Sequence, residues 1–226
     1  MDNMIVSVNP HVYAKDTTQT IMRDVLIALF PAVIASIVFF GVQALLVEVV
    51  CVAVAVLCEW AFEKITGRPV TILDCSAAVT GLILALNLPA SIPIWQAMFG
   101  SFVAIIVVKQ FFGGIGQNFA NPAITARVIM LVAFSGAMTT WAPAAFSNAP
   151  VDAATAATPL AILSGAEGEL PTLAQMFLGA RGGSLGETSC LALLLGFAYL
   201  LYRQVITWHT PVAFIGTVLV CTALLG

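Results

Sequence analysis

Charged residues are scarce in this chain of 226 residues. Asp, Glu, Lys and Arg make up 8% of it, hydrophobic residues make up 61%, and the mean hydropathy is +1.05. A soluble globular domain carries about 25% charged residues. Because a water-soluble fold could not bury this much apolar surface, the composition excludes a soluble domain and predicts an all-α polytopic membrane protein.

The chain also lacks the usual signals for a metal site or for secretion. Its five cysteines form no C-x-x-C pair and lie in or beside apolar runs, where cysteine acts as a small hydrophobic residue. His11 and His209 are too few and too far apart to predict a metal centre. Met1–Thr20 is polar, with no apolar core before a cleavage site, so we expect no cleavable signal peptide.

Seven apolar runs predict membrane-spanning helices. The third run, with about 17 residues, is at the short limit for a crossing, and its small residues favour close contact with another helix. The last run stops without a polar flank, so we expect the natural protein to continue and the helix count to be a lower bound. The predicted spans are Met22–Phe40, Ala44–Phe62, Ile72–Leu88, Ile94–Phe112, Ala123–Trp141, Thr188–Ile206 and Pro211–Gly226.

Capping residues predict several helix ends. Asp16, Thr17 and Thr18 stand just before the first span, and Pro122 suits the first turn of the fifth. Apolar residues at helical spacing within Leu170–Gly179 predict a short helix on the membrane surface. This helix would lie in the long loop Ala142–Glu187, between the fifth and sixth spans.

Basic residues predict the orientation. If the spans alternate, seven of the eight Lys and Arg residues lie on the side of the N-terminus and only Arg181 lies on the other side. Basic residues are enriched on the cytoplasmic side of membrane proteins. The sequence therefore predicts a cytoplasmic N-terminus and an outer Ala142–Glu187 loop.

Two threonines stand out in that loop, in the stretch Asp152–Leu160. Thr155 and Thr158 are three residues apart, Asp152 precedes them, and a proline follows Thr158. A threonine hydroxyl in a wet loop can form a phosphodiester and so hold a phosphorylated cofactor covalently. Threonine before proline is also common as a helix or turn cap, so the spacing alone leaves both interpretations open.

Several stretches together resemble one known family. The sequence is similar to the NqrB/RnfD family of respiratory membrane subunits, and more closely to its RnfD branch, because the Pro10-His11 element comes almost at the start of the chain. The matching stretches cover nearly the whole chain: Pro10-His11 with Asp16–Met22, Ser76–Pro89, Asn121–Ala123, Met138–Trp141, Asp152–Leu160 and Gly183–Ser189.

The resemblance implies a function and a cofactor. It implies a subunit of the Rnf complex, which moves electrons between ferredoxin and NAD and couples this flow to Na+ or H+ translocation. In this family FMN is joined through its phosphate to a threonine in a motif that Asp152, Thr155 and Thr158 match here, with Thr158 as the acceptor. The resemblance also suggests riboflavin as a second flavin, which nothing in the sequence locates.

The resemblance further implies an architecture and partners. It predicts a urea-transporter-like fold of inverted five-helix repeats in the bacterial inner membrane. Expected partners are membrane lipid, the other Rnf subunits and a flavin transferase, and no nucleic acid is expected. The implied divisions are residues 1–21, a cytoplasmic segment; 22–141, the first repeat; 142–187, a periplasmic or extracellular flavin loop; and 188–226, the start of the second repeat.

Glu48 is the most notable acid within a predicted span. Intramembrane acids are costly and often line ion paths, but an acid near a helix end can also reach the interface, so both roles remain open. Competing functions for the chain are a small-solute channel or secondary transporter, a purely structural subunit, and the NqrB subunit of a Na+-pumping NADH:quinone reductase. Covalent flavin would separate a flavoprotein from the first two.

Overall fold

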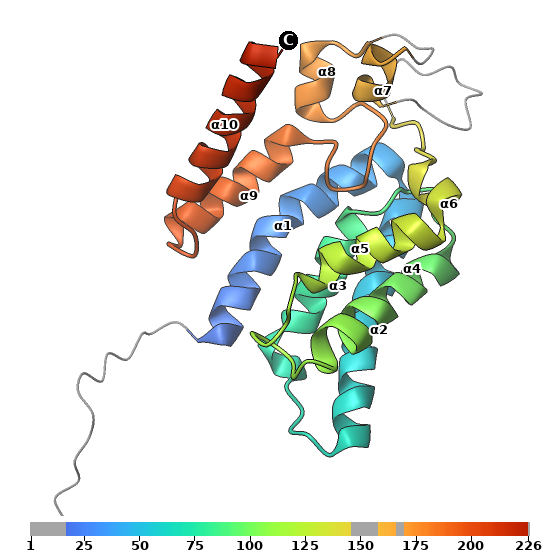
Figure 1. Ribbon diagram of the computed structural model, residues 1–226, viewed down its shortest axis with the longest axis vertical. Helices are drawn as coiled ribbons and strands as arrows, with labels where there is room; N and C mark the ends of the chain where they lie inside the picture. Colours follow the sequence, from blue (N-terminus) through green and yellow to red (C-terminus); the bar gives the residue numbers. More distant parts are fainter. Residues whose placement is uncertain (1–16, 146–157, 166–169, 226) are drawn as a thin grey trace, which may run out of the picture.

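The structure is a computed structural model that describes residues 17–145, 158–165 and 170–225, and Figure 1 shows its arrangement. These residues form ten α-helices with a short 3-10 helix and a π-helix, and they contain no strand. The predicted all-α fold is thereby confirmed. The elements are α1 (Thr18–Phe40), α2 (Val42–Thr66), η1 (Ile72–Asp74), α3 (Ser76–Leu86), α4 (Ile94–Phe102), η2 (Val103–Gln110), α5 (Pro122–Ala133), α6 (Ser135–Thr139), α7 (Pro159–Leu163), α8 (Leu173–Leu178), α9 (Cys190–Tyr202) and α10 (His209–Leu225).

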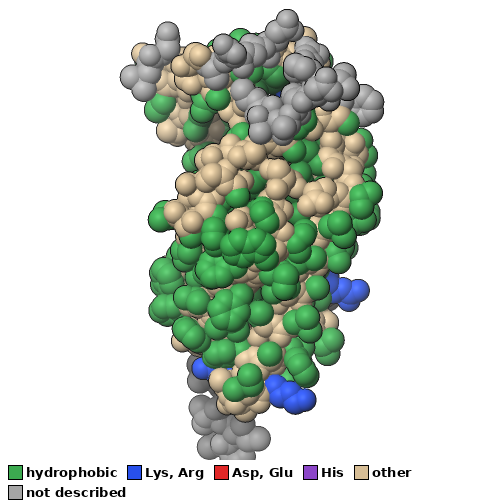
Figure 2. Space-filling model, turned by 90° about the vertical axis from the view of Figure 1, so that its right-hand side faces the viewer, with side chains coloured by type: hydrophobic (Ala, Val, Ile, Leu, Met, Phe, Trp, Pro, Cys, Tyr) green, Lys and Arg blue, Asp and Glu red, His purple; other side chains and the backbone are tan. Residues whose placement is uncertain are grey.

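The helices have the composition of membrane spans. Among the described residues α1 and α2 are long and apolar enough to cross a bilayer, and five shorter apolar helices accompany them. Hydrophobic side chains cover most of the face in Figure 2, and the basic side chains visible there lie toward one end. Apolar side chains on the outside of a helical protein match a hydrocarbon environment, so this is a membrane protein.

Helix caps lie where the sequence predicts them. Thr17 accepts a hydrogen bond from the backbone of Thr20 and opens α1 with a reciprocal capping box. Asn121 caps α5, in which Pro122 is the first residue, and Ser189 caps α9. The short surface helix predicted within Leu170–Gly179 is α8. These ends were predictable because each depends on a side chain only two or three residues from the backbone group it binds.

The prediction of a single third span is wrong. Cys75 adopts φ 63, in the left-handed region, and separates η1 from α3. Asp74 then accepts a hydrogen bond from the backbone N–H of Ser76 at 2.8 Å and starts a new helix. With 11 residues α3 is about 16 Å long, roughly half of a hydrocarbon core. The third element is therefore a half-length helix.

The predicted fifth span is also interrupted. Phe134, with φ −131 and ψ 46, separates α5 from the short helix α6. The ring of Phe134 packs edge-on against Trp95 and Phe99 of α4, with centroids 5.2 and 5.6 Å away. This aromatic cluster fixes the break against α4. The predicted fourth span is continuous, because η2 directly extends α4.

A strap from the long loop closes the end of α3. The strap comprises residues 183–188, in one of the stretches that carry the family resemblance. Its backbone N–H groups at Leu185 and Gly186 donate to the carbonyls of Leu88 at 3.0 Å and Leu86 at 2.7 Å. Since α3 stops at half length, these bonds satisfy carbonyls that a continued helix would have used.

A polar contact joins α1 to α9. Asp24 of α1 pairs with Arg203 at 3.0 Å and accepts a hydrogen bond from the Tyr199 hydroxyl at 3.0 Å. Deeper in the same contact, Gly196 of α9 lies so close to the carbonyl of Ala28 that a side chain there would collide with backbone. The sixth and seventh predicted spans correspond to α9 and α10, each shorter at its ends than predicted.

The centre of the fold is α2, which packs against α1, α3, α4 and η2. Its contact with α3 depends on Gly81. A Cβ at Gly81 would lie 2.8 Å from Ala55 Cβ and 2.8 Å from the carbonyl oxygen of Cys51. The two helices can approach this closely only because the position has no side chain.

We predict that Gly81→Val separates α2 from α3 and destabilises the protein by about 1–3 kcal/mol, the usual cost of overpacking. The measurement is thermal unfolding of the purified protein in detergent. Gly216→Val in α10 is the matched control, because no atom lies within 4 Å of the added Cβ position. Equal melting temperatures for both variants would contradict the proposed role of the close contact.

Candidate functional site

The buried face of α2 carries three acids in a line. Glu48, Cys51, Ala55, Glu59 and Glu63 follow one another at steps of three, four, four and four residues, and all are buried. This spacing puts them on one side of the helix. An acidic line within an apolar helix is costly unless each charge finds a partner. The partners of each acid therefore indicate what the line can do.

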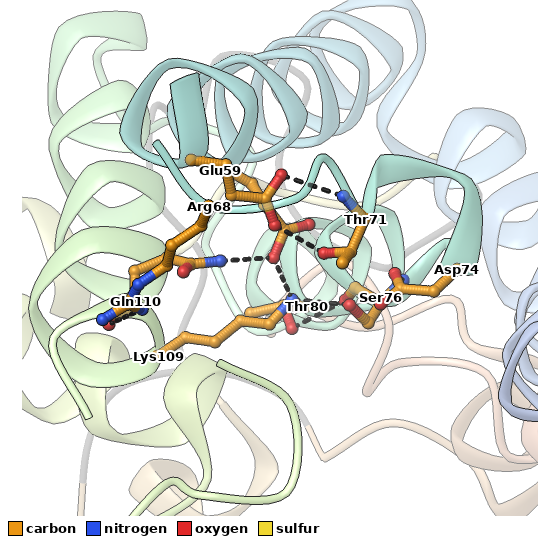
Figure 3. Close-up of polar contacts among 9 residues, drawn as sticks. Glu59, Arg68, Thr71, Asp74, Ser76, Thr80, Lys109 and Gln110 are labelled. Atoms are coloured by element: carbon orange, nitrogen blue, oxygen red, sulfur yellow. Dashed lines mark hydrogen bonds and ion pairs between the residues drawn. The ribbon is translucent and has the colours of Figure 1, made fainter. Parts of the chain in front are cut away.

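Glu59 forms an ion pair with Lys109 of η2. The Lys109 ammonium lies 2.6 Å from Glu59 Oε1, and both side chains are almost completely buried. Gln110 donates to the same carboxylate oxygen at 2.8 Å, and Lys109 also donates to the Ser76 hydroxyl at 2.6 Å (Figure 3). The second carboxylate oxygen of Glu59 has no hydrogen-bond partner among the described residues. The pair is neutral as a whole but keeps one free acceptor.

The π-helix η2 presents two consecutive side chains to this carboxylate. Lys109 and Gln110 both reach Glu59 from the last turn of η2, and the following amide of Phe111 donates to Ile106 five residues back at 3.0 Å. Segments with this wider turn occur frequently at functional sites. The unusual helix geometry and the ion pair thus coincide in one place.

A cavity adjoins the inner end of α2. It has a volume of about 350 Å³ and is lined by Glu63, Arg68, Thr71, Gln110 and residues of the Gly113–Gln117 loop. Glu63 accepts hydrogen bonds from the backbone and the hydroxyl of Thr71, and Arg68 donates to the carbonyl of Gln110 at 3.3 Å (Figure 3). Gln110 therefore borders the cavity and contacts Glu59, so a polar route leads from the cavity to the buried ion pair.

Glu48 occupies the other half of α2. Its side chain is only 3% exposed, so it does not reach the interface. One carboxylate oxygen lies 2.5 Å from the hydroxyl of Ser36 on α1, and the other has no partner among the described residues. The alternative of an interfacial acid does not fit this position. Glu48 is an intramembrane carboxyl with one hydrogen bond.

Thr158 opens the short helix α7. Its backbone is extended, and its hydroxyl oxygen accepts a hydrogen bond from the backbone N–H of Ala161 at 3.2 Å. The side chain is half-buried, and α7 packs against no other named helix among the described residues. Thr158 is therefore a helix cap, one of the two roles that its position before proline allowed. The hydroxyl proton is not needed for this cap.

Asp152 and Thr155 lie outside the described residues, so the structure does not place them relative to Thr158. The described flanks of the loop lie at the C-terminal end of α1. The N–H of Ala145 donates to the carbonyl of Phe39 at 2.8 Å, and Gly179 lies against the Phe39 ring. Figure 1 accordingly shows α7 and α8 at the end of the molecule opposite the first turn of α1.

The Glu59–Lys109 pair was not predicted from the sequence. Glu59 was expected near the inner helix end, and Lys109 was counted only as an inner positive charge. Two signals could have revealed the pair. Glu59 falls on the same helical face as Glu48, and Lys109 interrupts an apolar run, so each charge needed a buried partner.

We predict that Lys109→Met is strongly destabilising, by about 3–5 kcal/mol, because it leaves Glu59 as an uncompensated buried charge. Glu59→Gln should also destabilise the protein, because it strands the Lys109 ammonium. The double variant should recover most of the loss, since it removes both charges. Thermal unfolding of the four proteins in detergent measures the coupling.

Lys64→Met is the control for this cycle, because Lys64 is exposed in the same part of α2 and its loss should cost roughly 0.5 kcal/mol or less. Additive effects of the Glu59 and Lys109 substitutions would mean that the two charges do not depend on each other.

Comparisons with known proteins agree with this picture of a helical membrane subunit. The chain is 42% identical to the RnfD subunit of the Na(+)-translocating ferredoxin:NAD(+) oxidoreductase complex of Acetobacterium woodii, over 99% of this chain and 70% of the relative. It is also 42% identical to the corresponding subunit of the proton-translocating ferredoxin:NAD(+) oxidoreductase complex of Clostridium ljungdahlii, over 98% of this chain and 69% of the relative.

A third relative, the corresponding subunit of the ion-translocating oxidoreductase complex of Aliivibrio salmonicida, is 34% identical over 97% of this chain and 72% of its own length. The family described as NQR2, RnfD, RnfE matches residues 5–226. The chain therefore belongs to the NQR2, RnfD, RnfE family.

Proposed function

We propose that the chain is the RnfD subunit of an Rnf-type complex, in which it carries covalently bound FMN on Thr158. In this role it relays electrons between the ferredoxin and NAD branches, and the flow drives Na+ or H+ translocation. Relatives that match over nearly the whole chain bear the name of this subunit. The observation that carries the cofactor assignment is the Thr158 hydroxyl, which keeps its proton available at the start of an otherwise unpacked helix.

The residues present fit a phosphoester at this position. The cap needs only a lone pair on the Thr158 oxygen, and an ester oxygen retains one, so α7 can keep its first turn after modification. Leu160 and Leu163 on the same helix are 77% and 69% exposed, so no packed core blocks an approaching transferase. Esterification of Thr158 therefore requires no unfolding of the described fold.

FMN would supply the chemistry that no side chain of this chain offers, because a flavin accepts electrons singly or in pairs. The protein's task is to hold and orient the cofactor. A covalent bond to Thr158 keeps FMN on the outer face, where cytoplasmic FMN could not replace it. The loop flanks at Phe39 fix the position of this segment over the end of α1.

The proposed setting is the bacterial inner membrane, with the N-terminus in the cytoplasm. Membrane lipid, the other subunits of the complex and a flavin transferase are the proposed partners. The two relatives with equal identity are named for different ions, Na+ in one and protons in the other. Overall similarity therefore does not select the coupling ion.

We predict that Thr158→Asn abolishes covalent flavin but leaves the fold intact, because asparagine is as good a helix cap as threonine but lacks the hydroxyl. Thr158→Ser keeps both properties and should retain the flavin. Mass spectrometry of the peptide spanning 142–181, from protein made with its flavin transferase, should show the mass of one FMN less one water in the wild type and the serine variant.

Thr155→Ala should retain at least some flavin, since that residue would assist recognition and not form the bond. An unmodified wild-type peptide from an active complex would refute the tether and favour the channel or structural alternatives. Modification at Thr155 would preserve the function but move the bond to a different residue.

The proposed orientation predicts that Ser164, an exposed residue just after α7, faces the outside. In a chain without its native cysteines, Ser164→Cys should react with a membrane-impermeant thiol reagent added to intact cells. Lys64→Cys, exposed at the other end of the molecule, should react only after the membrane is permeabilised. The opposite labelling pattern would invert the proposed topology.

A further inference from the structure

Glu48 lies in an unusual cluster of buried oxygen atoms. Its Oε2 atom has no partner among the described residues, and neither has Oε1 of Gln96 nor the hydroxyl of Ser101, both on α4. Cys51, one turn from Glu48, joins the two helices. Its thiol contacts the carbonyl of Ala97 at 3.8 Å and interacts with the Ser101 hydroxyl. The contact between α2 and α4 is therefore rich in unused acceptors, an arrangement that native interiors rarely leave unexplained.

The hydrogen bonding of Ser36 bears on the protonation of Glu48. The Ser36 oxygen lies 2.7 Å from the carbonyl of Val33 and 2.5 Å from Glu48 Oε1. A hydroxyl has one proton and can donate it to only one of these acceptors. Both contacts are satisfied when Ser36 donates to Val33 and a protonated Glu48 donates to Ser36. This geometry suits a carboxyl that carries a proton.

Glu48 is also accessible. It lies in a groove of about 440 Å³ between α1, α2 and α3, whose other lining residues are apolar. Leu45 and Val49, beside it on α2, are 40% and 56% exposed. The carboxyl therefore sits beneath a groove and is not sealed in a packed core.

No basic side chain among the described residues compensates Glu48. Lys109 pairs with Glu59, three turns further along α2, and Arg203 pairs with Asp24 near the start of α1. On the elements packed around Glu48, the nearby polar groups are Ser36 of α1, Cys51 of α2, and Gln96 and Ser101 of α4, whereas α3 contributes Leu82 to the groove. Of these, only the thiol of Cys51 can titrate. An isolated carboxylate in hydrocarbon costs several kcal/mol, so it must be neutralised by a proton or a cation.

We propose that Glu48 is an exchangeable ion-binding carboxyl, which takes either a proton or a small monovalent cation such as Na+, with Ser36 as its hydrogen-bonding partner. A single positive charge balances the single carboxylate. Oxygen ligands without sulfur or imidazole suit hard cations. Binding at Glu48 does not depend on flavin. Its place on an ion-translocation path, where the sequence suggested it, rests on the proposed function.

The binding test uses dicyclohexylcarbodiimide, an apolar reagent that adds to protonated carboxyl groups. Membranes that contain the assembled complex are treated at several pH values, with NaCl or with choline chloride at equal ionic strength. Mass spectrometry then measures the adduct on Glu48. Glu187, which is exposed to water, serves as an internal reference that should not react at neutral pH.

We expect Glu48 to be labelled at neutral pH and the labelling to fall as pH rises. Protection by NaCl but not by choline chloride at fixed pH would identify a Na+ site, whereas dependence on pH alone would identify a proton site. Ser36→Ala should raise the Na+ concentration needed for protection, or change the pH dependence, because the carboxyl loses its partner. Absence of labelling, or labelling insensitive to both pH and Na+, would overturn the proposal.

The same labelling in the Thr158→Asn variant separates this proposal from the flavin proposal. Glu48 should react as in the wild type even when no flavin is attached. In the active complex, Glu48→Gln should lower ion transport more than electron transfer, since it removes the charge with little change in volume. Unaltered ion transport by this variant would exclude Glu48 from the translocation path.

Discussion

Hydrocarbon offers no hydrogen bonds, so every polar group within the membrane needs a partner inside the protein. This constraint accounts for the least regular parts of the fold. Where α3 ends at half length, the strap of residues 183–188 donates backbone hydrogen bonds to the freed carbonyls of Leu86 and Leu88. Where α2 carries Glu59, η2 supplies Lys109 and Gln110. The broken helices and the buried charges are thus compensated by segments that lie far away in the sequence.

The two intramembrane acids of α2 differ in how they are neutralised. Glu59 has a resident cation in Lys109, whereas Glu48 has only the hydroxyl of Ser36. Their separation of eleven residues corresponds to about 16 Å along the helix. Between them, Ala55 meets Gly81 of α3 in a contact that admits no side chain. The inner acid is therefore held in a fixed pair, the outer acid is free to exchange its counter-ion, and tight helix packing separates them.

The sequence predicted the helices better than their interruptions. Apolar runs and capping residues such as Thr17 and Asn121 act locally, and the structure confirms most of the helix positions they indicate. The breaks at Cys75 and Phe134 depend on tertiary contacts, because a left-handed cysteine or an aromatic cluster against α4 leaves no periodic signal. The pairing of Glu59 with Lys109 was hidden for the same reason. Composition shows that a buried charge needs a partner, but only the fold identifies it.

The C-terminal turn of α1 connects the two proposed sites. Phe39 holds both described flanks of the loop that contains Thr158, through the amide of Ala145 and the close contact with Gly179. Ser36, one turn earlier, holds Glu48. A helix transmits a shift of one turn to the next with little loss, because its backbone hydrogen bonds join successive turns. A displacement of the loop over Phe39 would therefore move the hydroxyl that fixes Glu48, which gives electron arrival at the outer face a direct mechanical route to the intramembrane carboxyl.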